Sequence, residues 1–252
     1  MFKQANRRNL KLRMALDGPA GSGKTITGLI FAHKLLDNKP LRPDGTRRIA
    51  VIDTEFGSAS IYAGYVIGGV KLEFDVVELS HFAQSTYVSC LDAAKREKYE
   101  IVLIDSLSHA WQGVGGALAQ VDAAGGNKFT DGWRQVTPQH NAMVNAILGY
   151  PGHVIATMRT KMEYVVELNE KGRSVPRKIG LKPIQREGVD YEFDIVIDAD
   201  TENTGLTPPG GALDHDLVGR PGGFRGIGND IRPELAQQLV GEHFGFDRRE
   251  KR

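Results

Sequence analysis

The sequence predicts an α/β fold: a mostly parallel central sheet with helices on both faces and a β-hairpin added to the core. Three observations lead to this prediction. Short apolar runs alternate with helical patterns along most of the chain. A glycine-rich loop joins the first run to the first helix, and two extended arms further along flank a turn. Strands that alternate with helices are joined by right-handed crossovers and therefore run parallel.

The first half of the chain supplies six elements. We predict strands at 12–17, 48–53, 72–79 and 99–105, the last nearly continuous in apolar residues, as in a buried parallel strand. The second helix spans 84–97 and includes Cys90, expected as a small core residue. The first helix follows the glycine-rich loop, and its apolar positions share the spacing of one helix face: Ile26, Leu29, Ile30, His33 and Leu36.

The second half begins with a helix for which Thr137 and Pro138 have the pattern of an N-cap and first helical residue. A strand at 153–158 follows, and then a β-hairpin at 163–179 around the turn Asn169–Gly172. Residues 191–200 form another predicted strand, 203–230 a loop or loose hairpin, and 232–246 a short helix. We expect a basic arm at 1–9, one core at 10–200, and a tail at 201–252.

The charge is unevenly distributed, although the net charge is only +1. Residues 1–13 carry five basic side chains and no acid, and residues 159–187 carry eight basic and four acidic ones. Residues 188–218 carry eight acids and no base. The low net charge argues against nonspecific attraction of the whole molecule to nucleic acid, whereas the local basic excess suits a defined groove.

Several classes of protein are excluded by simple counts. No apolar run approaches the roughly 18 residues of a membrane span, and the basic N-terminus lacks the apolar segment of a signal peptide. One cysteine cannot form an internal disulfide, and the seven histidines show no zinc-ligand spacing. We therefore expect a cytoplasmic protein with no membrane partner.

The glycine-rich loop fits the phosphate-binding pattern G-x4-G-K-[ST] at every fixed position, with a strand before it and a helix after it. Lys24 is expected to reach the β- and γ-phosphates, and the Thr25 hydroxyl to bind Mg²⁺. The glycines let backbone N–H groups converge on phosphate oxygens at the positive end of the helix. The expected nucleotide-binding residues are Gly18, Pro19, Ala20, Gly21, Ser22, Gly23, Lys24, Thr25 and Ile26.

Two carboxylates close later strands. Asp105 ends the fourth strand, where it can hold Mg²⁺ through water in the Walker B position. Glu55 follows the second strand and is our candidate for the residue that orients or deprotonates the attacking water, whereas Asp53 shares its face but lies deeper.

Polar residues further along are also candidates. Thr157 and Arg159 end the strand 153–158 and are candidates for sensing the γ-phosphate, although a basic loop surface would look the same. Lys182 and Arg186 could act on a neighbouring subunit's nucleotide or be plain surface charge. Trp111 and Trp133 flank a Gly/Ala-rich stretch at 113–128, either a flexible loop or a mobile contact for a polymer.

The order of these motifs resembles the RecA-like P-loop ATPases. The phosphate loop, "VIDTE", "IVLIDS", "VIATMRTK", the hairpin and "LKPIQREGVDYEFD" are most similar to small phage-encoded members of the AAA-type ATP-binding family, which includes single-strand annealing recombinases. The resemblance covers about residues 10–200. It implies catalytic roles for Lys24, Glu55 and Asp105, and DNA-contacting loops at roughly 109–131 and 160–178. It also implies rings or filaments with ATP between subunits, and thereby trans-acting roles for Lys182 and Arg186.

Three functions follow as hypotheses. The first is an ATPase using ATP and Mg²⁺, with DNA-stimulated hydrolysis, that binds single-stranded DNA and promotes annealing or strand exchange. Its partners would be other copies of the chain and a phage single-strand binding protein, in the bacterial host cytoplasm if the protein is phage-encoded. The second is a nucleoside monophosphate kinase, since "DGPAGSGKT" alone resembles the opening of such kinases. The third is a scaffold that uses ATP as a switch without useful turnover.

Overall fold

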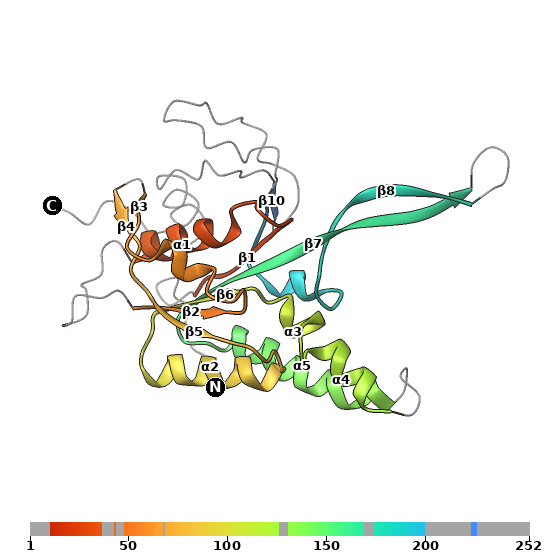
Figure 1. Ribbon diagram of the computed structural model, residues 1–252, viewed down its shortest axis with the longest axis horizontal. Coiled ribbons are helices and arrows are strands. Elements are labelled where there is room, and N and C mark those ends of the chain that lie inside the picture. Colours follow the sequence, from red (N-terminus) through yellow and green to blue (C-terminus); the bar gives the residue numbers. More distant parts are fainter. Residues whose placement is uncertain are drawn as a thin grey trace, which may run out of the picture.

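The computed structural model describes residues 11–36, 43, 48–67, 69–125, 131–168, 174–199 and 223–225. Its central sheet has the strand order β10-β9-β1-β7-β6-β2-β5, and neighbours along this order are parallel. The predicted α/β class is therefore confirmed (Figure 1). The sheet strands are β1 (Arg13–Gly18), β2 (Ile49–Asp53), β5 (Asp75–Glu78), β6 (Ile101–Asp105), β7 (His153–Leu168), β8 (Ser174–Pro183), β9 (Ile195–Asp198) and β10 (Gly223–Arg225).

Helices cover both faces of this sheet (Figure 1). The helix α1 packs on one face, and α2 and α5 pack on the other. The helices are α1 (Lys24–Leu35), α2 (Gln84–Arg96), α3 (His109–Gln112), α4 (Ala117–Ala123) and α5 (Trp133–Leu148), with short 3-10 turns η2 (Ala59–Tyr62) and η4 (Val189–Glu192). A separate two-stranded sheet pairs β3 (Val66–Ile67) with β4 (Val70–Lys71).

Strand β6 shows why the middle of the sheet is so apolar. All five of its residues are buried, because alternate side chains enter the cores on opposite faces of the sheet. Ile101 and Leu103 belong to the core under α1, and Val102 and Ile104 to the core under α2 and α5. Each large side chain buried in this way stabilises the fold by about 1.5–3 kcal/mol. The continuous apolar run read from the sequence thus reflects a strand covered on both faces.

Strand β7 lies between β1 and β6, so the strand before the phosphate loop and the strand that ends in Asp105 are not neighbours. Gly18 at the end of β1 pairs in register with Arg159 of β7, and Asp53 at the end of β2 pairs with Asp105. The carboxyl ends of four strands therefore gather at one edge of the sheet, where ligands bind in open α/β folds.

The hairpin is confirmed, but its first arm is not a separate strand as predicted. β7 runs without a break from His153 to Leu168: it pairs with the core as far as Arg159, and from Thr160 it pairs antiparallel with β8. Residues 158–163, "MRTKME", contain no Gly or Pro to interrupt the strand. The hairpin projects away from the core (Figure 1), and its predicted turn lies outside the described residues.

The predicted start of α5 at Thr137 and Pro138 is wrong. The helix begins at Trp133 and carries Pro138 inside it. Trp133 stacks on Trp111, with 5.3 Å between ring centroids and 25° between planes, and Val136 is buried against α4. This apolar packing stabilises the first turn of the helix. Its stabilisation outweighs the cost of Pro138, which cannot donate a backbone hydrogen bond within the helix.

The Gly/Ala-rich stretch after Trp111 is a loop only in part, because its middle is helical. Residues 117–123 form α4, whose Ala117 and Val121 are buried against Val136. A further correction concerns residues 223–225, which form a strand parallel to β9 where a loop or loose hairpin was predicted. The arm at 1–9 and the helix predicted at 232–246 lie outside the described residues. Within the described chain, no helix has the length and hydropathy to span a membrane.

Candidate functional site

The glycine-rich loop connects β1 to α1 in a conformation that two of its glycines make possible. Gly23, the N-cap of α1, has a φ of 76°, which L-residues with a Cβ rarely adopt. A Cβ on Gly18 would lie 2.6 Å from the carbonyl oxygen of Ala199. No side chain caps α1, so its first N–H groups and the positive end of its dipole are left for an anion.

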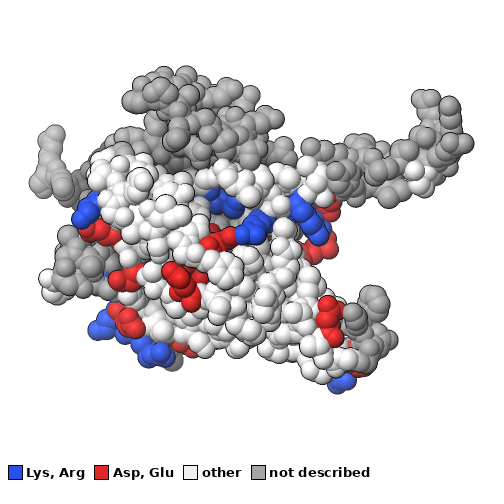
Figure 2. All heavy atoms as spheres, in the orientation of Figure 1, with Lys and Arg blue, Asp and Glu red and all other residues white. Residues whose placement is uncertain are grey.

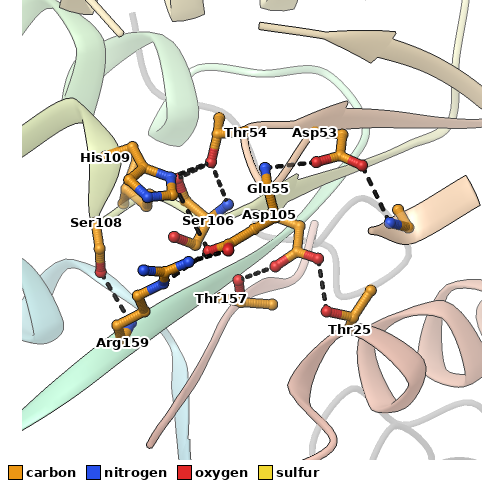
Figure 3. A network of polar contacts seen from close by, with 12 residues as sticks. Thr25, Asp53, Thr54, Glu55, Asp105, Ser106, Ser108, His109, Thr157 and Arg159 are labelled. Carbon is orange, nitrogen blue, oxygen red and sulfur yellow. Dashed lines mark hydrogen bonds and ion pairs between the residues drawn. The ribbon is translucent and has the colours of Figure 1, made fainter. Parts of the chain in front are cut away.

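Thr25 and Asp105, the two predicted Mg²⁺ residues, are brought together although 80 residues separate them. The Thr25 hydroxyl donates to Asp105 Oδ2 at 2.6 Å, and Thr157 donates to Oδ1 from the intervening strand β7 (Figure 3). Burial raises the pKa of Asp105, whereas the two hydroxyl donors lower it. A hydroxyl and a carboxylate at one point are hard oxygen ligands that fit Mg²⁺.

Lys24 lies within the loop itself. Its ammonium group donates to the carbonyl oxygen of Pro19 at 2.6 Å and lies 3.4 Å from the hydroxyl of Ser22. Burial lowers the pKa of Lys24, and the nearby carboxylates of Asp105 and Glu55 raise it. The cation is thus held at the loop and surrounded by charges, as a group that contacts phosphate oxygens must be.

Glu55 is paired with Arg159. The guanidinium donates from Nε to Glu55 Oε1 at 2.8 Å and from Nη2 to Oε2, a bidentate ion pair between β7 and the segment after β2. The Glu55 side chain is one-fifth exposed and the Arg159 side chain about two-fifths. The sequence marked both residues as candidates but gave no sign that they pair.

Asp53 and Thr157 hold the site together rather than face it. Asp53 is fully buried and accepts hydrogen bonds from the backbone N–H groups of Glu55 and Ala59, which fixes the loop that follows β2. This agrees with its predicted deeper position. Thr157, a candidate for sensing phosphate, is fully buried, and its hydroxyl is bound to Asp105.

The structure adds three residues that the sequence analysis missed: Thr54, Ser108 and His109. The Thr54 hydroxyl lies 2.7 Å from His109 Nδ1, and Ser108 Oγ accepts from the backbone N–H of Arg159 at 2.8 Å. Figure 3 shows these groups around the Glu55–Arg159 pair. No spacing rule singles them out, since each contacts a partner that is distant in the sequence.

Asp17, the residue before the loop, is a second missed feature. It is 2% exposed, and its Oδ1 has no hydrogen-bond partner. Burial raises the pKa of this carboxyl well above its usual range; the neighbouring Asp198 and Asp190 raise it further, and Lys24 lowers it. A buried carboxylate of this kind destabilises the folded state when it is charged.

Asp17→Asn is expected to stabilise the protein, and more so at higher pH. Because the folded pKa is raised above the unfolded one, the folded state binds the proton more tightly, and its stability falls as pH rises above the unfolded value. We expect a rise in Tm of roughly 2–4 °C at pH 8, as about 1 kcal/mol gives in a domain of this size, and a smaller rise at pH 5. Thermal unfolding at both pH values tests this, and an equal change at both would contradict it.

Lys182 and Arg186 are not brought to the phosphate loop of their own chain. Lys182 pairs with Glu163 across the hairpin at 3.3 Å, and this partner raises its pKa. Arg186 donates to Asn141 of α5 at 3.0 Å and lines an open surface pocket of about 380 Å³. Their proposed action on a neighbouring subunit is left untested by these positions.

The arrangement as a whole suits phosphate chemistry. The glycine-rich loop lies at the same sheet edge as the Thr25–Asp105 contact and the Glu55–Arg159 pair. Figure 3 shows the two pairs. In the described part of the chain, no group of three His, Cys, Asp or Glu side chains could hold a metal by itself.

Comparison with known proteins agrees with this interpretation. The family model described as "AAA domain" matches residues 10–219. No curated protein matches the chain.

Proposed function

Because the chain belongs to the AAA domain family, we propose that it is an ATPase, that its phosphate loop is the nucleotide site, and that ATP hydrolysis serves single-stranded DNA. In this proposal the protein binds single strands and promotes their annealing or exchange, as phage-encoded recombinases of the RecA-like type do. It acts as a homo-oligomer, ring or filament, with Lys182 and Arg186 directed at a neighbour's nucleotide. A phage single-strand binding protein is its expected companion.

The nucleotide would be held by residues of the loop and of the sheet edge. The backbone and Lys24 of the loop would bind the phosphates, and Thr25 with Asp105 would hold Mg²⁺. The ion, when bound, neutralises charge on the phosphate oxygens. Glu55 would orient the attacking water or accept a proton from it. The positive charge of Arg159, which lies beside Glu55, would favour a negatively charged phosphate group nearby.

The observation that carries the DNA proposal is the position of Arg159. It is the last residue of β7 that pairs with the core, and the next residue begins the hairpin. A ligand bound to the hairpin would therefore contact the same strand, β7, that carries Arg159. Arg159 in turn binds Glu55, so such a ligand could change the position of Glu55. The segment 159–187, which includes the hairpin, carries eight of the chain's 32 basic residues. Elsewhere on the face in Figure 2, basic and acidic side chains among the described residues are interspersed.

The expected result is an ATPase rate that rises when single-stranded DNA is added, together with binding that weakens with salt. If one subunit neutralises Z phosphates, log affinity should fall against log salt with a slope of about −0.7Z. Replacing Arg177 and Lys178 of β8 by Gln should reduce the magnitude of that slope by about 1.4. The matched control is Lys95→Gln with Arg96→Gln. These two exposed residues lie in the last turn of α2, away from the hairpin, and their replacement should leave the slope unchanged.

Other outcomes point to the two alternatives. An unchanged rate with DNA, with no salt-sensitive binding, would contradict the DNA proposal and leave the ATPase. Phosphate transfer to a nucleoside monophosphate would indicate a kinase. Tight ATP binding with no phosphate release would favour the switch, which the Glu55–Arg159 pair also suits, because each carboxylate oxygen already accepts a hydrogen bond and has fewer lone pairs left for water.

A further inference from the structure

His109 is a polar residue of the site for which the proposed function has no role. It is the first residue of α3, four residues after Asp105, and its side chain is 13% exposed. The ring stacks on Phe82, with 4.9 Å between centroids and 25° between planes. Its Nδ1 lies 2.7 Å from Thr54 Oγ1 and 4.0 Å from Glu55 Oε1 (Figure 3).

The contacts of the Thr54 hydroxyl constrain the imidazole. This oxygen accepts from the Ser106 N–H at 2.7 Å and lies 3.1 Å from the Ser106 carbonyl oxygen, to which it can donate. A hydroxyl has one proton to donate and two lone pairs to accept with. All three contacts can be hydrogen bonds at once only if His109 Nδ1 carries a proton and donates to Thr54. Burial lowers the pKa of His109, which favours the neutral ring. The contacts of the Thr54 hydroxyl then assign the single ring proton to Nδ1.

Thr54 in turn controls where Glu55 lies. Thr54 is fully buried and is bound on one side by Ser106 and on the other by His109. Glu55 is the next residue, and its own N–H is held by Asp53 at 2.6 Å. The backbone from which the Glu55 side chain projects is thus fixed by contacts with Ser106, His109 and Asp53. The Arg159 pair holds only the tip of that side chain.

We propose that His109 is a positioning residue for ATP hydrolysis, which orients Glu55 through the contact of Nδ1 with Thr54. The inference rests on the proposed role of Glu55 as the group that acts on water. A misplacement of about 1 Å at a reacting group can lower a rate by about 100-fold. The contact between His109 and Thr54 should therefore affect kcat strongly and nucleotide binding little.

The test compares His109→Asn with His109→Gln. The Asn amide nitrogen can take the place of Nδ1, whereas the Gln amide nitrogen takes that of Nε2. Both variants lose the ring that stacks on Phe82, so packing is matched. We expect His109→Gln to lower kcat about 10-fold or more with KM for ATP within about two-fold, and His109→Asn to restore most of the rate.

A second pair of variants tests the same contact from the other side. Thr54→Val removes the hydroxyl and should lower kcat as His109→Gln does, while Thr54→Ser keeps it. The double variant, His109→Gln with Thr54→Val, should be little worse than Thr54→Val alone, because that substitution already removes the contact with His109 together with the two to Ser106. Fluorescence of Trp111 and Trp133, the two tryptophans of the chain, reports whether this region stays folded.

Equal kcat values for His109→Asn and His109→Gln would overturn the proposal, whether both fall or neither does. Multiplied losses in the double variant would do the same. Glu55→Gln separates this failure from that of the proposed function. If Glu55→Gln still hydrolyses ATP, the role of Glu55 is wrong; if it is inactive and both His109 variants are unaffected, only the positioning role fails.

Discussion

Glu55→Gln is expected to lower kcat for ATP hydrolysis by about 10²–10⁴-fold, the range for loss of a general base. The Kd for ATP should change by less than about three-fold. Glutamine keeps the shape of the side chain and an oxygen that can still accept from Arg159, but it cannot take a proton from water. Phosphate release and binding of a fluorescent nucleotide measure the two quantities separately.

A matched control for this variant lies on the next strand. Glu78 ends β5 at the same edge of the sheet, pairs in register with Asp53, and is exposed. Glu78→Gln makes the same chemical change one strand away and should leave kcat within about two-fold of the parent. Hydrolysis by Glu55→Gln at the parent rate would show that another group acts on water.

Lys24→Ala is expected to abolish useful nucleotide binding. The loss of a charged donor to phosphate should raise the Kd for ATP about 30-fold or more, equivalent to roughly 2 kcal/mol. The free protein should keep its Tm, because burial lowers the pKa of Lys24 and its charged form therefore gives the fold little net stability. Titration calorimetry, with thermal unfolding at rising ATP, tests both statements.

The control for the lysine variant is Lys71→Ala. Lys71 belongs to β4, its side chain is 62% exposed, and it pairs with Glu73. This variant should keep the rise in Tm that ATP gives to the parent, whereas Lys24→Ala should lose it. An unchanged rise in Lys24→Ala would place the nucleotide elsewhere.

Much of the fold could be predicted from local patterns. The phosphate loop, the strand before it, the helix after it and the hairpin are each encoded within about 20 residues. The signals are glycines at fixed spacing and apolar residues at regular intervals. Thr25 and Asp105 also proved to be neighbours, because strand ends in a parallel sheet meet at one edge. The start of α5 failed because Trp133 packs on Trp111, a contact that no cap residue signals.

By itself, the sequence determined that this chain has the phosphate-loop motif, a threonine and an aspartate of the types that bind magnesium beside such loops, and a carboxylate just after a strand. The tertiary structure decided which of these groups touch. Arg159 reaches Glu55 across 104 residues because a single strand, β6, lies between β7 and β2, and His109 reaches Thr54 because β2 lies beside β6. The physical reason is that residue spacing controls contacts within one turn or loop, whereas strand order controls contacts between loops. Strand order is fixed by burial of apolar surface over the whole sheet.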